Sequence, residues 1–328
     1  MLEDLHLGDG LNLGTTDGRI ALDCSVRRTR QGHYCISTTD FFFPLVDSPY
    51  LQGRIGACNV LSDLYAEGCA DCDFVLMLLA ACRDMPVDVR NICTREMVRG
   101  FRDACAEAGA AVTGGQTVLN PWPIIGGVAT SIVAEGEFVP SDGARPGDVV
   151  VLTKPLGTQV AVNVRQWRMQ DDRLWGEVLN KGLLDEGAAD DLYHEACASM
   201  ARLNRTGSEL MLKHSANAAT DVTGFGILGH AQNLAENQKA SVNIELQKLP
   251  CLKGSVRVND EVFDFGLAVG YSAETSGGLL VCLPADRAAL FIRDLEARDG
   301  EKAWVIGRVL ESPERGATMA NSVEVIEV

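Results

Sequence analysis

The chain has 328 residues, enough for two domains that each bury a hydrophobic core. Apolar residues make up 46% and charged residues 23% of it, a balance typical of soluble globular proteins that excludes wholesale disorder and fibrous repeats. The formal net charge is −16, from 29 basic and 45 acidic residues. Because such a field repels polyanions, we expect no nucleic acid and no membrane as a partner, and an anionic nucleotide would need local cations.

The expected location is cytoplasmic. The most apolar run, Phe74–Cys82, falls far short of a membrane span. The acidic residues 1–10 are unlike a signal peptide. The eleven cysteines are odd in number and scattered, which favours reduced thiols over disulfides.

Strands and helices alternate in the first half of the chain. Apolar and β-branched runs predict strands, and apolar spacing with terminal glycines predicts helices. The strands are expected at 19–26, 34–39, 74–80, 110–113 and 124–134, the first two as a hairpin, and the helices at 53–68 and 89–108. Segment 140–148 is rich in Pro, Gly and Asp and indicates a boundary, which gives domains 1–146 and 147–328.

The second half shows the same mixture. Strands are expected at 149–154, 242–246, 279–283 and 304–309, helices at 190–213, from the turn 221–226 to 236, and at 286–297. Strands mixed with helices in both halves predict an α/β or α+β fold in two domains of similar size.

Four aspartates lie next to small residues at or near the ends of these elements. Asp40 follows a predicted strand, Asp63 lies on the glycine-rich helix, Asp221 stands between a strand and a glycine turn, and Asp23 belongs to the hairpin. Asn59 is four residues before Asp63 and shares its helix face. Hard oxygen ligands of this kind suit Mg²⁺, although any one aspartate alone is more often a cap or turn residue.

Two further features indicate phosphate binding, each with an ordinary alternative. The segment 114–117 (GGQT) follows a short predicted strand, so its backbone N–H groups could surround phosphate oxygens or simply form a Gly-Gly turn. Lys154 closes a buried strand and could meet an anion or be solvated.

A dinucleotide site is the alternative that one glycine pattern raises. Gly224, Gly226 and Gly229 form a G-x-G-x-x-G pattern, with Glu245 further along the chain, as in a fold that binds NAD or a flavin. The strand expected before it, NAATDVT, is polar where that fold needs a buried parallel strand, which disfavours this reading.

Six segments, in chain order, closely resemble the selenophosphate synthetase (selenide, water dikinase) family. They are 37–68, 113–130, 150–162, 200–207, 218–235 and 274–284. The resemblance implies the fold of aminoimidazole ribonucleotide synthetase, with an N-terminal domain that forms the core of a homodimer and a C-terminal α/β domain. It also implies that ATP, selenide and water give selenophosphate, AMP and orthophosphate.

The resemblance also assigns roles to residues. Asp23, Asp63 and Asp221 match the family's Mg²⁺ ligands, and Asp40 matches a residue at both the metal and the nucleotide phosphates. Gly115, Gln116 and Thr117 match the family's nucleotide-binding segment, and the 224–229 pattern matches a family turn. Phosphoryl transfer needs charge neutralisation and positioning, which aspartate-bound Mg²⁺ supplies.

The sequence departs from the family pattern at its start. Family members carry a glycine-rich segment with a cysteine or selenocysteine followed by a lysine, whereas residues 1–18 contain no Cys and no Lys. We therefore expect an N-terminally truncated core, inactive alone, with none of the family's catalytic residues in this chain. The alternative is a non-catalytic, regulatory nucleotide-binding relative.

Overall fold

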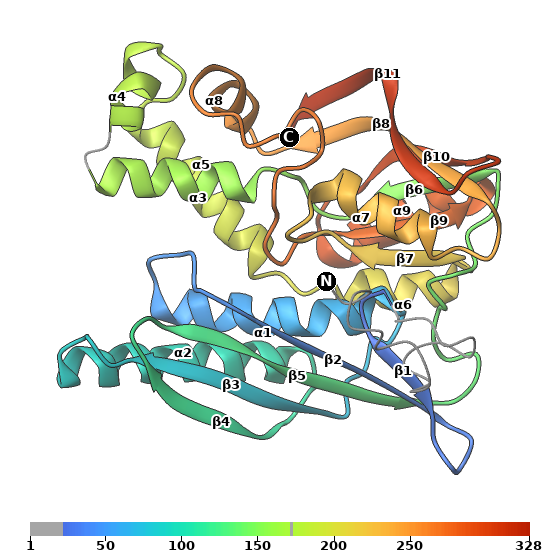
Figure 1. Cartoon of the computed structure of the whole chain (residues 1–328), viewed down its shortest axis with the longest axis horizontal. Helices are drawn as coiled ribbons and strands as arrows, with labels where there is room; N and C mark the ends of the chain where they lie inside the picture. The colour runs from blue at the N-terminus through green and yellow to red at the C-terminus, as the bar shows by residue number, and fades with distance from the viewer. Residues whose placement is uncertain (1–21, 171–172) are drawn as a thin grey trace.

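The computed structural model describes residues 22–170 and 173–328 and builds them into two β-sheets with associated helices (Figure 1). The prediction about residues 1–18, and the start of the first predicted strand at 19–21, lie outside the described residues. None of the helices in the described ranges is long and apolar enough to cross a membrane.

The first sheet has the strand order β1-β2-β5-β3-β4. Only the pairing of β4 with β3 is parallel; the other pairings are antiparallel. Its elements are β1 (Ser25–Arg28), β2 (Tyr34–Phe42), α1 (Pro49–Ala66), β3 (Phe74–Cys82), α2 (Val87–Glu107), β4 (Val112–Asn120) and β5 (Ile124–Val133). The predicted hairpin and both predicted helices of this half are confirmed.

The second sheet has the order β11-β8-β10-β6-β9-β7. Its strands are β6 (Asp148–Leu152), β7 (Ala218–Asp221), β8 (Val242–Cys251), β9 (Leu279–Pro284), β10 (Trp304–Glu311) and β11 (Gly316–Glu327). The accompanying helices are α3 (Thr158–Met169), α4 (Arg173–Asn180), α5 (Glu186–Met200), α6 (Arg205–Lys213), α7 (Gly226–Glu236), α8 (Ser255–Glu261) and α9 (Ala285–Asp299).

Helix α1 lies between the first sheet and the second half of the chain (Figure 1). It packs on β2 and β5 on one side and meets β7, β9, α5 and α6 on the other. Two glycines bring α1 and α2 close together, because a Cβ on Gly53 would lie 2.0 Å from the carbonyl oxygen of Met97. The contacts of α1 with β7 and β9 hold it against the second sheet.

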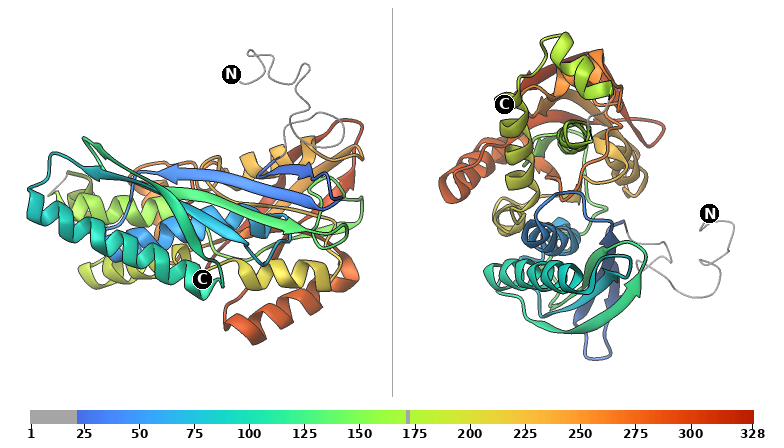
Figure 2. Two further views of the ribbon diagram at one scale, coloured as in Figure 1. Left: turned by 90° about the horizontal axis from the view of Figure 1, so that it is seen from below. Right: turned by 90° about the vertical axis from the view of Figure 1, so that its left-hand side faces the viewer.

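The outer face of the first sheet has no helix over it among the described elements (Figure 2). Large apolar side chains on this face are exposed: Phe41 (57%), Val118 (49%) and Ile132 (51%). Monomeric proteins rarely leave contiguous apolar surface of this kind uncovered, so this sheet is a candidate interface.

Two predictions about the elements were wrong. The strand expected at 110–113 runs on to Asn120 as β4 and includes Gly114–Thr117, since pairing with β3 overrides the turn preference of Gly-Gly. The helix expected at 190–213 is two helices, α5 and α6. Asn204 lies between them and donates to the Ser62 hydroxyl (2.9 Å) and the Gly277 carbonyl (2.8 Å), contacts that tie this break to α1. No sequence pattern had predicted α3, α4, α8 or β11.

Candidate active site

Three aspartates from different elements meet where α1 abuts the second sheet. Asp23 lies just before β1, Asp63 lies near the end of α1, and Asp221 is the last residue of β7. One carboxylate oxygen from each lies within 4.8 Å of the other two. The fold therefore assembles three of the four predicted metal ligands from positions 40 to 198 residues apart in the sequence.

Hydroxyl groups orient these carboxylates. Thr38 donates to Asp63, and Thr220 donates to Oδ1 of Asp23 at 3.0 Å. Ser62, next to Asp63 in the chain, hydrogen-bonds to Asp221. These hydroxyls were not among the predicted site residues, although Ser62 and Thr220 each directly precede an aspartate of the cluster.

Two oxygens of the cluster lack a partner. Oδ2 of Asp23 and Oδ2 of Asp221 are buried and have no hydrogen-bond partner within the described residues. Buried carboxylate oxygens are costly when they are unpaired. Because Mg²⁺ prefers carboxylate oxygens, the donor set and its two free oxygens fit a bound magnesium ion.

The electrostatics of the cluster lead to the same conclusion. Burial, followed by the charges of neighbouring carboxylates, raises the pKa of Asp23 and of Asp63 well above its ordinary value. Burial and Asp40 raise the pKa of Asp221 to about 6. The carboxylates repel one another, and a divalent cation would relieve that repulsion.

Asp40 lies at the edge of this cluster. It is part of β2, not beyond its end as predicted, and it accepts a hydrogen bond from the Asn59 side chain. Asp40 is close enough to raise the pKa of Asp63 and of Asp221, but it is not one of the three carboxylates that meet. Asn59 Oδ1 in turn accepts from the Ser276 backbone N–H at 2.8 Å.

The segment Gly115–Thr117 lies away from the aspartates. It belongs to the exposed edge strand β4, and β5 and β3 separate β4 from β2, which carries Asp40. Because neighbouring strands are about 4.8 Å apart, three such spacings lie between β4 and β2. Gly115 has φ +142°, and a Cβ there would lie 1.9 Å from the Met77 carbonyl oxygen, so this position requires glycine. Within one chain the two parts of the predicted site remain apart.

Lys154 is fully buried, so the solvated alternative is wrong. Its ammonium group donates to the backbone carbonyls of Arg202 (2.7 Å) and Ser276 (2.8 Å). Burial lowers the pKa of Lys154 to about 7, and Lys154 in turn lowers the pKa of Asp221. The lysine therefore lies near the aspartates and braces the loop that contains Ser276.

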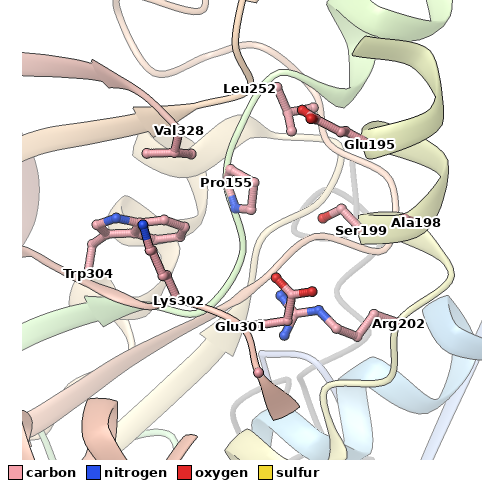
Figure 3. A pocket seen from close by; sticks show the side chains of 11 residues that line it. Pro155, Glu195, Ala198, Ser199, Arg202, Leu252, Glu301, Lys302, Trp304 and Val328 are labelled. Carbon is pink, nitrogen blue, oxygen red and sulfur yellow. The ribbon is translucent and has the colours of Figure 1, made fainter. Parts of the chain in front are cut away.

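A cavity of about 380 Å³ lies near Lys154, but none of the predicted site aspartates lines it (Figure 3). Arg202, whose carbonyl accepts from Lys154, lines this cavity, and its side chain faces Glu301. Lys302 and Trp304 also line it. This cavity is separate from the carboxylate cluster.

The dinucleotide alternative has no structural support within the described residues. Its preceding strand, β7, is an edge strand antiparallel to β9, whereas the dinucleotide fold needs a parallel strand of a β-α-β unit. Glu245 lies on β8, several strands away, and pairs with Arg308 at 2.9 Å. The glycine pattern instead shapes the turn after Asp221, where His230 Nε2 accepts from the Thr223 N–H at 3.0 Å.

Comparison with known proteins identifies the class of protein to which this two-domain fold belongs. The family described as AIR synthase related protein matches residues 21–133 with its N-terminal domain and residues 145–319 with its C-terminal domain. A ThiL in complex with AMPPCP and TMP superposes with a TM-score of 0.69 at 19% identity, covering 98% of this chain and 92% of that one. A HypE from a HypE–HypF complex gives 0.71 at 19% identity, covering 98% and 96%. The chain therefore has the two-domain AIR synthase related fold.

Curated relatives narrow the class to one family. A selenide, water dikinase of Trypanosoma brucei brucei is 49% identical over 329 residues, covering 97% of this chain and 84% of that protein. Selenide, water dikinase 2 of Homo sapiens is 49% identical over 313 residues, covering 94% and 69%. The chain belongs to the selenide, water dikinase family.

Proposed function

We propose that this chain is the ATP- and magnesium-binding core of a selenide, water dikinase, in which ATP, selenide and water give selenophosphate, AMP and orthophosphate. The observation that carries the proposal is the meeting of Asp23, Asp63 and Asp221 within 4.8 Å, in a chain 49% identical to a selenide, water dikinase. Relatives that share only the fold contribute nothing to the choice of substrate.

The four carboxylates have two roles in the proposal. Asp23, Asp63 and Asp221 would hold Mg²⁺, in orientations set by the three hydroxyls described above, and the ion would give the unpaired oxygens of Asp23 and Asp221 a partner. Asp40, fixed by Asn59, lies at the side where the phosphates enter. When bound, Mg²⁺ neutralises phosphate charge and holds the transferring group in line. This cation also allows a chain of net charge −16 to bind ATP.

The separation of Gly115–Thr117 from the aspartates supports a homodimer. We infer that the N-terminal domain, residues 1–146, pairs through the first sheet, whose outer face carries exposed apolar side chains. In such a dimer the Gly115–Thr117 segment of one copy can approach the aspartates of the other. The nucleotide site would then draw on both copies.

Phosphorus NMR of the natural protein in full, with ATP, Mg²⁺ and selenide, tests the reaction. We expect signals of selenophosphate, AMP and orthophosphate, and their loss in an Asp63→Asn variant that still folds. Nucleotide binding without selenophosphate would reject the dikinase assignment and favour the non-catalytic, regulatory relative.

A further inference from the structure

Ser276 has an unusual backbone conformation and an unsatisfied side chain. Its φ is +47°, in the left-handed region that L-residues other than glycine, asparagine and aspartate seldom adopt. The residue is 1% exposed, and its hydroxyl has no hydrogen-bond partner within the described part of the chain. Strained backbone and buried unpaired polar groups both destabilise a fold, and both occur most often at functional sites.

The surrounding structure locks the backbone of Ser276 on both sides. Its N–H donates to Asn59 Oδ1 at 2.8 Å, and its carbonyl accepts from the Lys154 ammonium at 2.8 Å. The next two residues are packed with no room for a side chain, because a Cβ on Gly277 would lie 2.1 Å from the Val222 carbonyl oxygen and one on Gly278 would lie 2.4 Å from the backbone nitrogen of Lys154. The hydroxyl is thus the one polar group of Ser276 left without a partner.

These contacts place Ser276 among the groups that surround the carboxylate cluster. Asn59, which accepts from its N–H, also donates to Asp40. Lys154, which donates to its carbonyl, is near enough to lower the pKa of Asp221. Val222, packed against Gly277, directly follows Asp221 in the chain. The backbone of Ser276 therefore lies between Asn59, which holds Asp40, and Lys154, which is near Asp221.

We propose that the Ser276 hydroxyl is a nucleotide-binding group that donates a hydrogen bond to a phosphate oxygen of the metal-bound nucleotide. The inference rests on the proposed function, because it takes the ligand of the cluster to be Mg²⁺ with a nucleoside triphosphate. A charged phosphate oxygen is the strongest acceptor such a hydroxyl meets. Binding then satisfies a group that the free protein leaves unpaired, and the strained loop holds it in place beforehand.

Three variants test the proposal. Ser276→Ala removes the hydroxyl and keeps the backbone strain, and Ser276→Gly removes both. Ser215→Gly is the matched control: Ser215 also has positive φ (+56°) but is exposed in the turn after α6. Calorimetric titration with ATP in excess Mg²⁺ measures affinity, calorimetric titration with Mg²⁺ alone measures metal binding, and a thermal scan without nucleotide measures stability.

We expect Ser276→Ala and Ser276→Gly each to weaken ATP binding by about tenfold or more, the effect of losing a hydrogen bond to a charged group. Binding of Mg²⁺ alone should be unchanged. Neither change should lower the melting temperature, and Ser276→Gly should raise it by ~2 °C as strain is released. Ser215→Gly should raise the melting temperature likewise and leave ATP binding unaltered.

Three results would overturn the proposal. ATP affinity of Ser276→Ala within twofold of the unaltered chain would show that the hydroxyl does not contact the nucleotide. A lower melting temperature in Ser276→Ala would show a structural hydroxyl, paired with buried water. Failure of the unaltered chain to bind ATP with Mg²⁺ would reject the proposed function as well, so the two failures are distinguishable.

Discussion

Replacing Asp221 by Asn should stabilise the metal-free protein, because Asp221 is an ionised group held among other carboxylates. Its pKa is raised from 3.8 to about 6, a difference of roughly 2 pH units, and each unit corresponds to about 1.4 kcal/mol. Ionised Asp221 therefore lowers the free energy of unfolding by up to about 3 kcal/mol. Asparagine keeps the shape, and its amide can donate to the neighbouring carboxylates, which relieves the repulsion.

The pH dependence follows from the direction of the shift. A carboxyl whose pKa is raised on folding holds its proton more tightly in the folded chain. Stability is therefore greatest where Asp221 is protonated and falls as the pH rises from 3.8 towards 6. The advantage of Asp221→Asn should be full at pH 7.5 and should vanish below pH 3.8.

Urea unfolding at these pH values, with EDTA or with Mg²⁺, measures the effect. In EDTA at pH 7.5 we expect Asp221→Asn to be more stable by about 1–3 kcal/mol; added Mg²⁺ should stabilise the unaltered chain and have little effect on the variant. Asp84→Asn is the control, since the Asp84 side chain is 66% exposed and its replacement should change little. A variant less stable than the unaltered chain in EDTA would refute the reasoning.

Three further predictions concern other residues. Burial lowers the pKa of His230 from 6.5 to about 4, so the unfolded chain takes up a proton first and the free energy of unfolding falls as the pH drops from 6.5 to 4. In urea unfolding, His230→Gln should make stability less dependent on pH in this range. An unchanged pH dependence would contradict the lowered pKa of His230. Gly115→Ala should destabilise the fold by about 2–3 kcal/mol in a melting experiment, because its Cβ would lie 1.9 Å from the Met77 carbonyl oxygen at φ +142°. Gly114→Ala is the control, since its Cβ would meet only a side-chain methyl at 3.4 Å. Equal stability of the two variants would show that position 115 does not require glycine. Val118→Asp, at a side chain 49% exposed on the outer face of the first sheet, should convert a dimer to monomer in light scattering after gel filtration, whereas an unchanged mass would contradict the proposed interface.

The sequence predicted the elements that carry the aspartates better than it predicted their meeting. Asp63 was expected on a helix and Asp221 at the end of a strand, and both are there. Their approach depends on α1 lying between the two sheets, which involves close helix contacts at Gly53. No local pattern encodes a contact between residues so far apart in the chain, so the residues alone suggested candidate ligands and only the family resemblance assigned them to one metal site.

Other features depended on tertiary contacts that override local preference. The Gly114–Gly115 pair is typical of a turn, yet pairing with β3 places both residues in strand β4. A lysine at the end of a strand is usually solvated, yet the ammonium group of Lys154 is buried and donates to two backbone carbonyls. The strain at Ser276 has no signature in the sequence, because it arises from hydrogen bonds to two distant residues.

The central claim is that Asp23, Asp63 and Asp221 together bind the Mg²⁺ that brings ATP to this chain. Calorimetric titration of ATP into the unaltered chain, in Mg²⁺ and in EDTA, and into Asp63→Ala and Asp221→Ala in Mg²⁺, tests it most directly. We predict binding by the unaltered chain in Mg²⁺ and none in the other three titrations. ATP binding that persists unchanged in both variants would contradict the claim.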